Sequence, residues 1–78
     1  MSMIELTPRQ ADVAKQLLLG HGNAAIAKAC GVEIVTIKLH IRSMCQITQT
    51  LNRTHLALTL ERKGIKIKEP YRRSKVES

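Results

Sequence analysis

The segment EIVTIKLHIRSM, residues 33–44, decides the fold expected for this chain of 78 residues. When successive residues are turned by about 100°, the α-helical increment, the apolar side chains in and just after this segment gather on one side. That side holds Ile34, Ile37, Ile41, Met44, Cys45 and Thr48. The opposite side holds Val35, Lys38, Leu39, Arg42, Gln46 and Gln49. This second face is rich in hydrogen-bonding groups and has no acid, so it suits phosphates and the acceptor-rich edges of the DNA major groove.

The residues before this segment predict a shorter helix and a tight corner. Asn23 is a good N-cap for a helix from residue 24 to residue 29 or 30, whose small side chains would let another helix approach closely. Gly31 can take the left-handed conformation that a helix–turn–helix corner needs. The spacing therefore predicts a helix–turn–helix with the helix at 34–48 as its second helix, although many other αα-corners share this spacing.

Two further helices complete an expected all-α, four-helix domain. Thr7 as N-cap, Pro8 at the first helical position and Gln10 closing a capping box predict a helix over 8–19, which Gly20 ends. A second helix is expected over 53–63, ended by Gly64. The side chains expected to face inward from these two helices are Val13, Ala14, Leu17, Leu18, Leu56 and Leu60.

The two ends of the chain carry weaker signals. Residues 1–5 are expected to be a frayed lead-in. Residues 65–68 alternate apolar and basic side chains, but four residues are too few to predict a strand. We therefore expect one domain over 1–65 and a flexible basic tail over 66–78.

Composition narrows the class of partner. Thirteen basic and six acidic residues give a net charge of +7, which predicts a polyanionic partner, although ribosomal or membrane-surface binding would share this charge. Tyr71 is the only aromatic residue, which argues against base-stacking platforms and structured-RNA binding. Without a signal peptide or transmembrane run, the chain is expected in the cytoplasm with no membrane partner.

The sequence predicts neither a metal site nor a catalytic site. Cys30 and Cys45 are interpreted as buried reduced thiols, with a disulfide or a redox switch as the alternative. His21, His40 and His55 show no metal-ligand spacing, so neither a metal nor another cofactor is expected. No paired carboxylates and no nucleophile–base pair stand out, and we therefore do not expect an enzyme.

Several side chains on the helix at 34–48 and at the start of the last helix suit contacts with DNA. Lys38 and Arg42, one turn apart, can reach guanine O6 and N7, the alternative being two solvated cations. Leu39 can meet a thymine methyl group or pack against a partner chain. Thr36 near the helix N-terminus and Arg53 at the start of the last helix are suited to phosphates.

Several motifs together resemble the LuxR/FixJ/GerE-type DNA-binding domain, without a gap from Leu6 to Ile65. They are Leu6-Thr7-Pro8-Arg9-Gln10, Val13, Gly20, Asn23, Ile26-Ala27, Gly31-Val32, Thr36-Ile37-Lys38-Leu39-His40, Asn52-Arg53-Thr54 and Gly64-Ile65. The resemblance implies a four-helix domain that binds two-fold sites in double-stranded DNA as a homodimer through the last helix, and the exposed face of that helix offers Leu58 and Arg62. The resemblance assigns base contacts to Lys38, Leu39 and Arg42. It assigns backbone contacts or support of the fold to Asn23, Thr36, His40 and Arg53.

The chain departs from the family pattern at several positions. Glu33 stands where the family usually has a capping Ser or Thr, and Ala24-Ala25 stands where a Lys-Glu pair is common. Most members carry a receiver or ligand-binding domain upstream, whereas this sequence predicts a stand-alone transcriptional regulator set by its abundance or by a separate partner. The alternative is an adaptor or anti-regulator that binds another LuxR-type protein or RNA polymerase rather than DNA.

Overall fold

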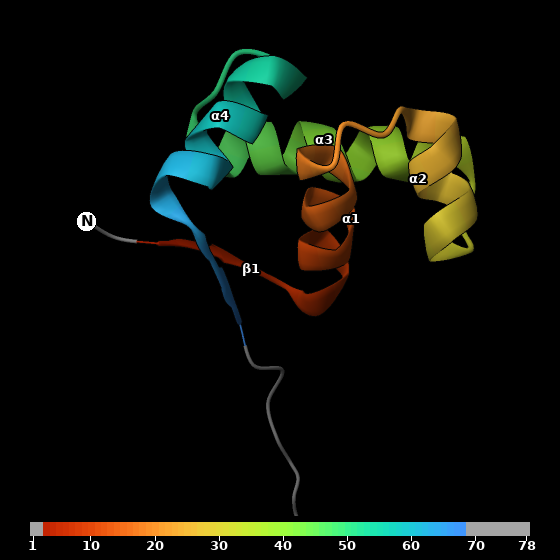
Figure 1. Cartoon of the computed structure of the whole chain (residues 1–78), viewed down its shortest axis with the longest axis horizontal. Helices are drawn as coiled ribbons and strands as arrows, with labels where there is room; N and C mark the ends of the chain where they lie inside the picture. Colours follow the sequence, from red (N-terminus) through yellow and green to blue (C-terminus); the bar gives the residue numbers. More distant parts are fainter. Residues whose placement is uncertain (1–2, 69–78) are drawn as a thin grey trace, which may run out of the picture.

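The computed structural model describes residues 3–68, which form four helices and two short strands. Their order is β1 (Ile4–Leu6), α1 (Pro8–Leu18), α2 (Asn23–Cys30), α3 (Ile34–Thr48), α4 (Arg53–Lys63) and β2 (Ile65–Ile67). In Figure 1, α3 runs across the molecule, α1 crosses it, and α2 and α4 lie toward its opposite ends. This arrangement confirms the predicted class, a small helical domain with a helix–turn–helix.

The start of α1 is set by the capping box that its sequence predicts. Thr7 Oγ1 accepts a hydrogen bond from the Gln10 backbone N–H at 3.2 Å, and Gln10 Oε1 accepts one from the Thr7 backbone N–H at 3.1 Å. Pro8 occupies the first turn, where its missing N–H costs no intrahelical bond. Local side chains therefore satisfy backbone donors that a helix start leaves unpaired.

The observed helix bounds agree with the predicted ones to within one residue. α3 and α4 span the predicted ranges 34–48 and 53–63. α1 ends at residue 18 instead of 19, and α2 begins at residue 23 instead of 24. Asn23 was predicted to be the N-cap of α2, but it is the first residue of that helix. Gly22 takes the capping position with an extended backbone.

The core is aliphatic, and its side chains come from all four helices and β1. Its buried apolar residues are Leu6, Ala11, Val13, Ala14, Leu17, Ile26, Ala27, Ile37, Ile41, Met44, Leu56 and Leu60. Two side chains expected inside are exposed, Leu18 by 40% and Ile34 by 45%. Each lies in the terminal turn of its helix, where the neighbouring helices no longer cover the apolar face. Cys30 and Cys45 are free thiols packed against the core, but they are only half-buried.

The two ends of the domain pair as a small parallel sheet, where frayed residues and a tail were predicted. Ile4 lies opposite Ile65 and Leu6 opposite Ile67. The Ile4 N–H donates to the Gly64 carbonyl at 2.9 Å, and the Lys68 N–H donates to the Leu6 carbonyl at 2.6 Å. The frayed lead-in predicted over residues 1–5 was therefore wrong for Ile4 and Glu5, and residues 65–67, for which no strand was predicted, form β2. Three-residue strands are too short to show a period, and their pairing joins opposite ends of the chain. Residues 69–78 of the expected tail lie outside the described residues.

Candidate nucleic-acid interface

The corner between α2 and α3 is built on one glycine. Gly31 has φ 69° and ψ 35°, the left-handed conformation predicted for it, which glycine adopts without the strain that a Cβ would cause. The Val32 N–H then donates to the Ala27 carbonyl at 3.0 Å, which closes the end of α2. Glu33 follows with an extended backbone and begins α3 without a side-chain capping bond. The turn therefore sets the angle at which α3 leaves α2.

Packing fixes which face of α3 points outward. Ile37, Ile41 and Met44 are buried in the core. The six side chains predicted on the opposite face are all exposed: Val35, Lys38, Leu39, Arg42, Gln46 and Gln49. Because the whole helix lacks Asp and Glu, this outward face carries positive charge that no acid of α3 neutralises. The geometry suits a polyanion.

The three predicted base-contact residues lie together on this outward face. Lys38 and Arg42 are exposed, and Leu39 beside them is 60% exposed. The predicted backbone-contact residues on the same helix, Thr36 and His40, are half-buried along its flank. One helix therefore presents an exposed central ridge with two half-buried polar side chains next to it.

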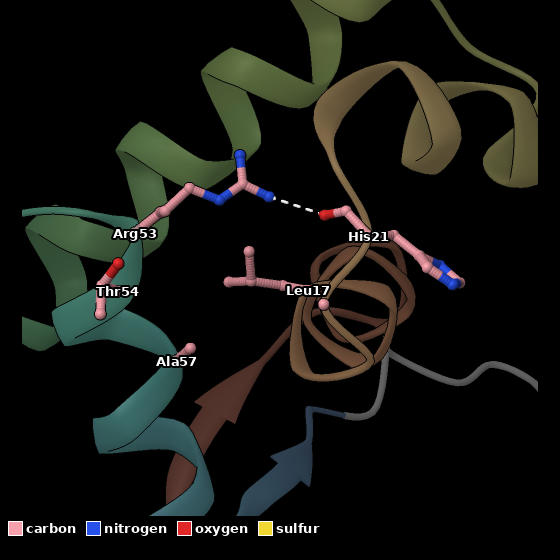
Figure 2. A pocket seen from close by; sticks show the side chains of 6 residues that line it. Leu17, His21, Arg53, Thr54 and Ala57 are labelled. Carbon is pink, nitrogen blue, oxygen red and sulfur yellow. Dashed lines mark hydrogen bonds between the residues drawn. The ribbon is translucent and has the colours of Figure 1, made fainter.

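Asn23 and Arg53, two further predicted backbone contacts, are brought into contact with each other. Arg53 Nη1 donates to Asn23 Oδ1, and Arg53 Nη2 donates to the His21 carbonyl at 2.9 Å. Figure 2 shows the second bond, which spans from the start of α4 to the segment before α2. The guanidinium group thus ties the N-terminus of α4 to that of α2. An arginine has five N–H donors, so this clamp leaves others available.

An open hollow of about 350 Å³ lies between α3, the start of α2 and the start of α4. Four of the predicted contact residues line it, namely Asn23, Lys38, Arg42 and Arg53, although they are distant in the sequence. Three of these four side chains are cationic, so the hollow is electropositive. Leu39, Thr36 and His40 do not line it, and they extend the surface along α3 instead.

A smaller hollow lies on the other side of the Arg53 clamp. It has a volume of about 220 Å³ and is lined by Leu17, Gly20, His21, Arg53, Thr54 and Ala57. In Figure 2 the Leu17 side chain points from α1 toward α4, and Arg53 crosses above it. This volume is below the usual range of ligand pockets, roughly 300–1,000 Å³.

The predicted dimer face on α4 is exposed, and a neighbouring leucine adds to the apolar surface. Leu58 is 60% exposed and Arg62 is exposed. Leu51, in the connector before α4, is 88% exposed and was not among the residues predicted from the sequence.

The N-cap of α4 is Asn52, a role that was not predicted for it. Its Oδ1 accepts from the His55 N–H at 2.9 Å. An asparagine just before a helical pattern was the available signal.

Residues 3–68 show neither a metal-binding cluster nor a membrane-spanning helix. That range holds no group of three or more His, Cys, Asp or Glu side chains able to bind a metal ion. Within the same part of the chain, no helix has the length and apolar character needed to cross a membrane.

The sequence model of one protein family, described as bacterial regulatory proteins, luxR family, matches residues 5–60. The matched region runs from β1 to the last turn of α4 and includes the complete helix–turn–helix. No curated protein and no solved structure matches the chain.

Proposed function

The chain belongs to the luxR family of bacterial regulatory proteins, and from this membership we propose that it regulates transcription by binding specific sites in double-stranded DNA. α3 enters the major groove, where Lys38, Leu39 and Arg42 contact base edges. The protein acts in the cytoplasm, where bacterial DNA lies. No catalytic step and no cofactor is part of this proposal.

One observation carries the proposal: the outward face of α3 combines exposed cations with an apolar side chain and has no acid. Lys38 and Arg42 offer donors to the guanine acceptors O6 and N7, and arginine can do so with two parallel bonds. Burial of Ile37, Ile41 and Met44 behind them holds the helix in one orientation. Lys38 and Arg42 are therefore carried on a rigid helix, as sequence-specific contacts with bases require.

Backbone phosphates are held by residues around this ridge. Thr36 lies in the first turn of α3, where the helix dipole also favours anions. His40 lies on the flank of the same helix. Asn23 and Arg53 border the electropositive hollow beside Lys38 and Arg42, so a phosphate next to the groove would meet several donors at once.

The binding species is a homodimer formed through α4, with Leu58 and Arg62 in the interface. Leu58 is 60% exposed on a helix whose other leucines, Leu56 and Leu60, are buried in the core. A two-fold dimer places two copies of α3 on half-sites about one turn of DNA apart. Sedimentation of Leu58→Glu, compared with the wild-type protein, tests this part. A variant whose mass on and off DNA equals that of the wild type would contradict it.

The central test compares Arg42→Ala with a matched control, Lys15→Ala, which removes an exposed positive charge from α1. On a duplex selected from a random library, Arg42→Ala should lose about 1–3 kcal/mol of binding free energy and relax preference at one base pair. Lys15→Ala should change affinity little. Equal losses of Arg42→Ala on selected and random duplexes would refute base reading.

The exposed leucines favour one rival function, an adaptor that binds RNA polymerase or another LuxR-type protein. Leu51 and Leu58, 88% and 60% exposed, give such a partner apolar surface near α4. Titration on random duplex at two salt concentrations separates the two functions. The affinity of a DNA binder falls steeply with salt because counterions are released, whereas an adaptor binds weakly at both concentrations.

A further inference from the structure

The outermost ridge of α3 changes chemical character along the helix. Val35 and Leu39 are one turn apart in its first half, and each is 60% exposed. Arg42 and Gln46 continue the same ridge in the second half, and both are exposed. The spacing of these four residues, i, i+4, i+7 and i+11, keeps them on one line of the helix surface. The ridge therefore has an apolar half followed by a hydrogen-bonding half.

The core does not account for the apolar half. Val35 and Leu39 lie opposite the buried side chains of α3, and hydrogen-bonding residues would serve solubility equally well at these two positions. Lys38 lies beside the pair and Arg42 follows it, both exposed, and α3 supplies no acid to accompany them. An apolar protein surface docked here would have to desolvate these cations without compensation. The occupant should instead offer apolar groups among hydrogen-bond acceptors.

The major groove offers this combination wherever thymine occurs. Each thymine presents a C5 methyl group beside its O4 acceptor, and the neighbouring purines present N7. Residues four apart on a helix are separated by about 6 Å along its axis, against about 3.4 Å for one step along a DNA strand. Val35 and Leu39 can therefore reach methyl groups about two base pairs apart.

We propose that Val35 and Leu39 together form a contact for thymine C5 methyl groups, so that preferred sites carry thymines at two positions about two base pairs apart in each half-site. This inference rests on the proposed function and adds a specificity residue, Val35, to its base contacts. Lys38 and Arg42 donate hydrogen bonds to guanines in the groove, and Val35 and Leu39 select thymine.

The test removes methyl groups without changing base pairing. A duplex is selected from a random library with the full-length protein, and each thymine is then replaced singly by deoxyuridine, which lacks only the C5 methyl. At two positions of each half-site, the Kd should rise about fourfold, the effect of withdrawing one buried methyl-sized group. Deoxyuridine outside the half-sites should leave the Kd unchanged.

Three variants assign the effect to residues. Leu39→Ala should bind thymine and deoxyuridine equally at one of the two positions, and Val35→Ala should do so at the other. The control is Leu19→Ala, which removes a side chain that is 68% exposed at the end of α1. For this variant, deoxyuridine at either position should raise the Kd as much as it does for the wild type. All three side chains are exposed, so thermal melting should show that the variants are folded like the wild type.

The outcomes separate this inference from the function on which it rests. If every thymine can be replaced by deoxyuridine while the selected duplex is still preferred over random duplex, the methyl contact is wrong and DNA recognition stands. If deoxyuridine raises the Kd of Leu39→Ala and Val35→Ala as much as it does for the wild type, these two residues do not form the methyl contact. If the wild-type protein binds selected and random duplexes equally at low and high salt, sequence recognition and the methyl contact both fall.

Discussion

Replacing Arg53 by alanine should weaken the domain more than its partly exposed position suggests. The substitution removes both bonds of the clamp, to Asn23 Oδ1 and to the His21 carbonyl. Hydrogen bonds from charged groups contribute about 1.5–3 kcal/mol, and solvent reduces this for the exposed bond to His21. Counting about 1.5 kcal/mol for the half-buried bond and about 0.5 kcal/mol for the exposed one, we expect a loss of about 2 kcal/mol in the free energy of unfolding.

Urea denaturation followed by circular dichroism measures this loss, and a thermal melt should show a fall in Tm of about 8–16 °C for a domain of this size. Lys63→Ala is the matched control, since it removes an exposed positive charge from the same helix, outside the proposed interface residues, and should change the unfolding free energy by less than about 0.5 kcal/mol. Arg53→Lys should restore less than half of the loss, because an ammonium group cannot reproduce the two-pronged geometry of the guanidinium.

A double-mutant cycle with Asn23→Ala identifies the bond. Residues in direct contact should show a coupling of about 1 kcal/mol, whereas independent residues should give additive losses. Additive losses, or an Arg53→Ala variant as stable as Lys63→Ala, would refute the clamp. On DNA, Arg53→Ala should also lower the slope of log K against log salt by about 1, if its remaining donors hold a phosphate.

Three further predictions concern the frame that carries α3. Thr7→Ala removes one half of the capping box and should cost about 1 kcal/mol in urea denaturation; an unchanged midpoint would show that the cap contributes nothing. Gly31→Ala places a Cβ at φ 69° and should cost about 1–2 kcal/mol, with a lower Tm as the readout, although the space around Gly31 is open. The amide hydrogens of Ile4 and Lys68, bonded across the ends of the sheet, should exchange slowly with solvent, and rates like those of an unfolded peptide would contradict the sheet.

Much of this protein follows from patterns within short stretches of the chain. The four helices and the outward face of α3 are readable from apolar periodicity, and Thr7, Gly31 and Gly64 mark helix ends because caps and left-handed turns depend on neighbouring residues alone. The resemblance to the luxR family rests on the same local motifs, and the family match confirms it. The base-contact, backbone-contact and dimer assignments remain predictions.

Features that join distant parts of the chain were decided only by the tertiary structure. The β1–β2 pairing, the Arg53–Asn23 clamp and the hollow that gathers Lys38 with Arg53 each link segments that local periodicity does not connect. The clamp also explains why Asn23 does not cap α2, since its side-chain oxygen accepts from Arg53 instead. A side chain with two possible partners takes the one that packing brings within reach, and packing depends on the whole chain.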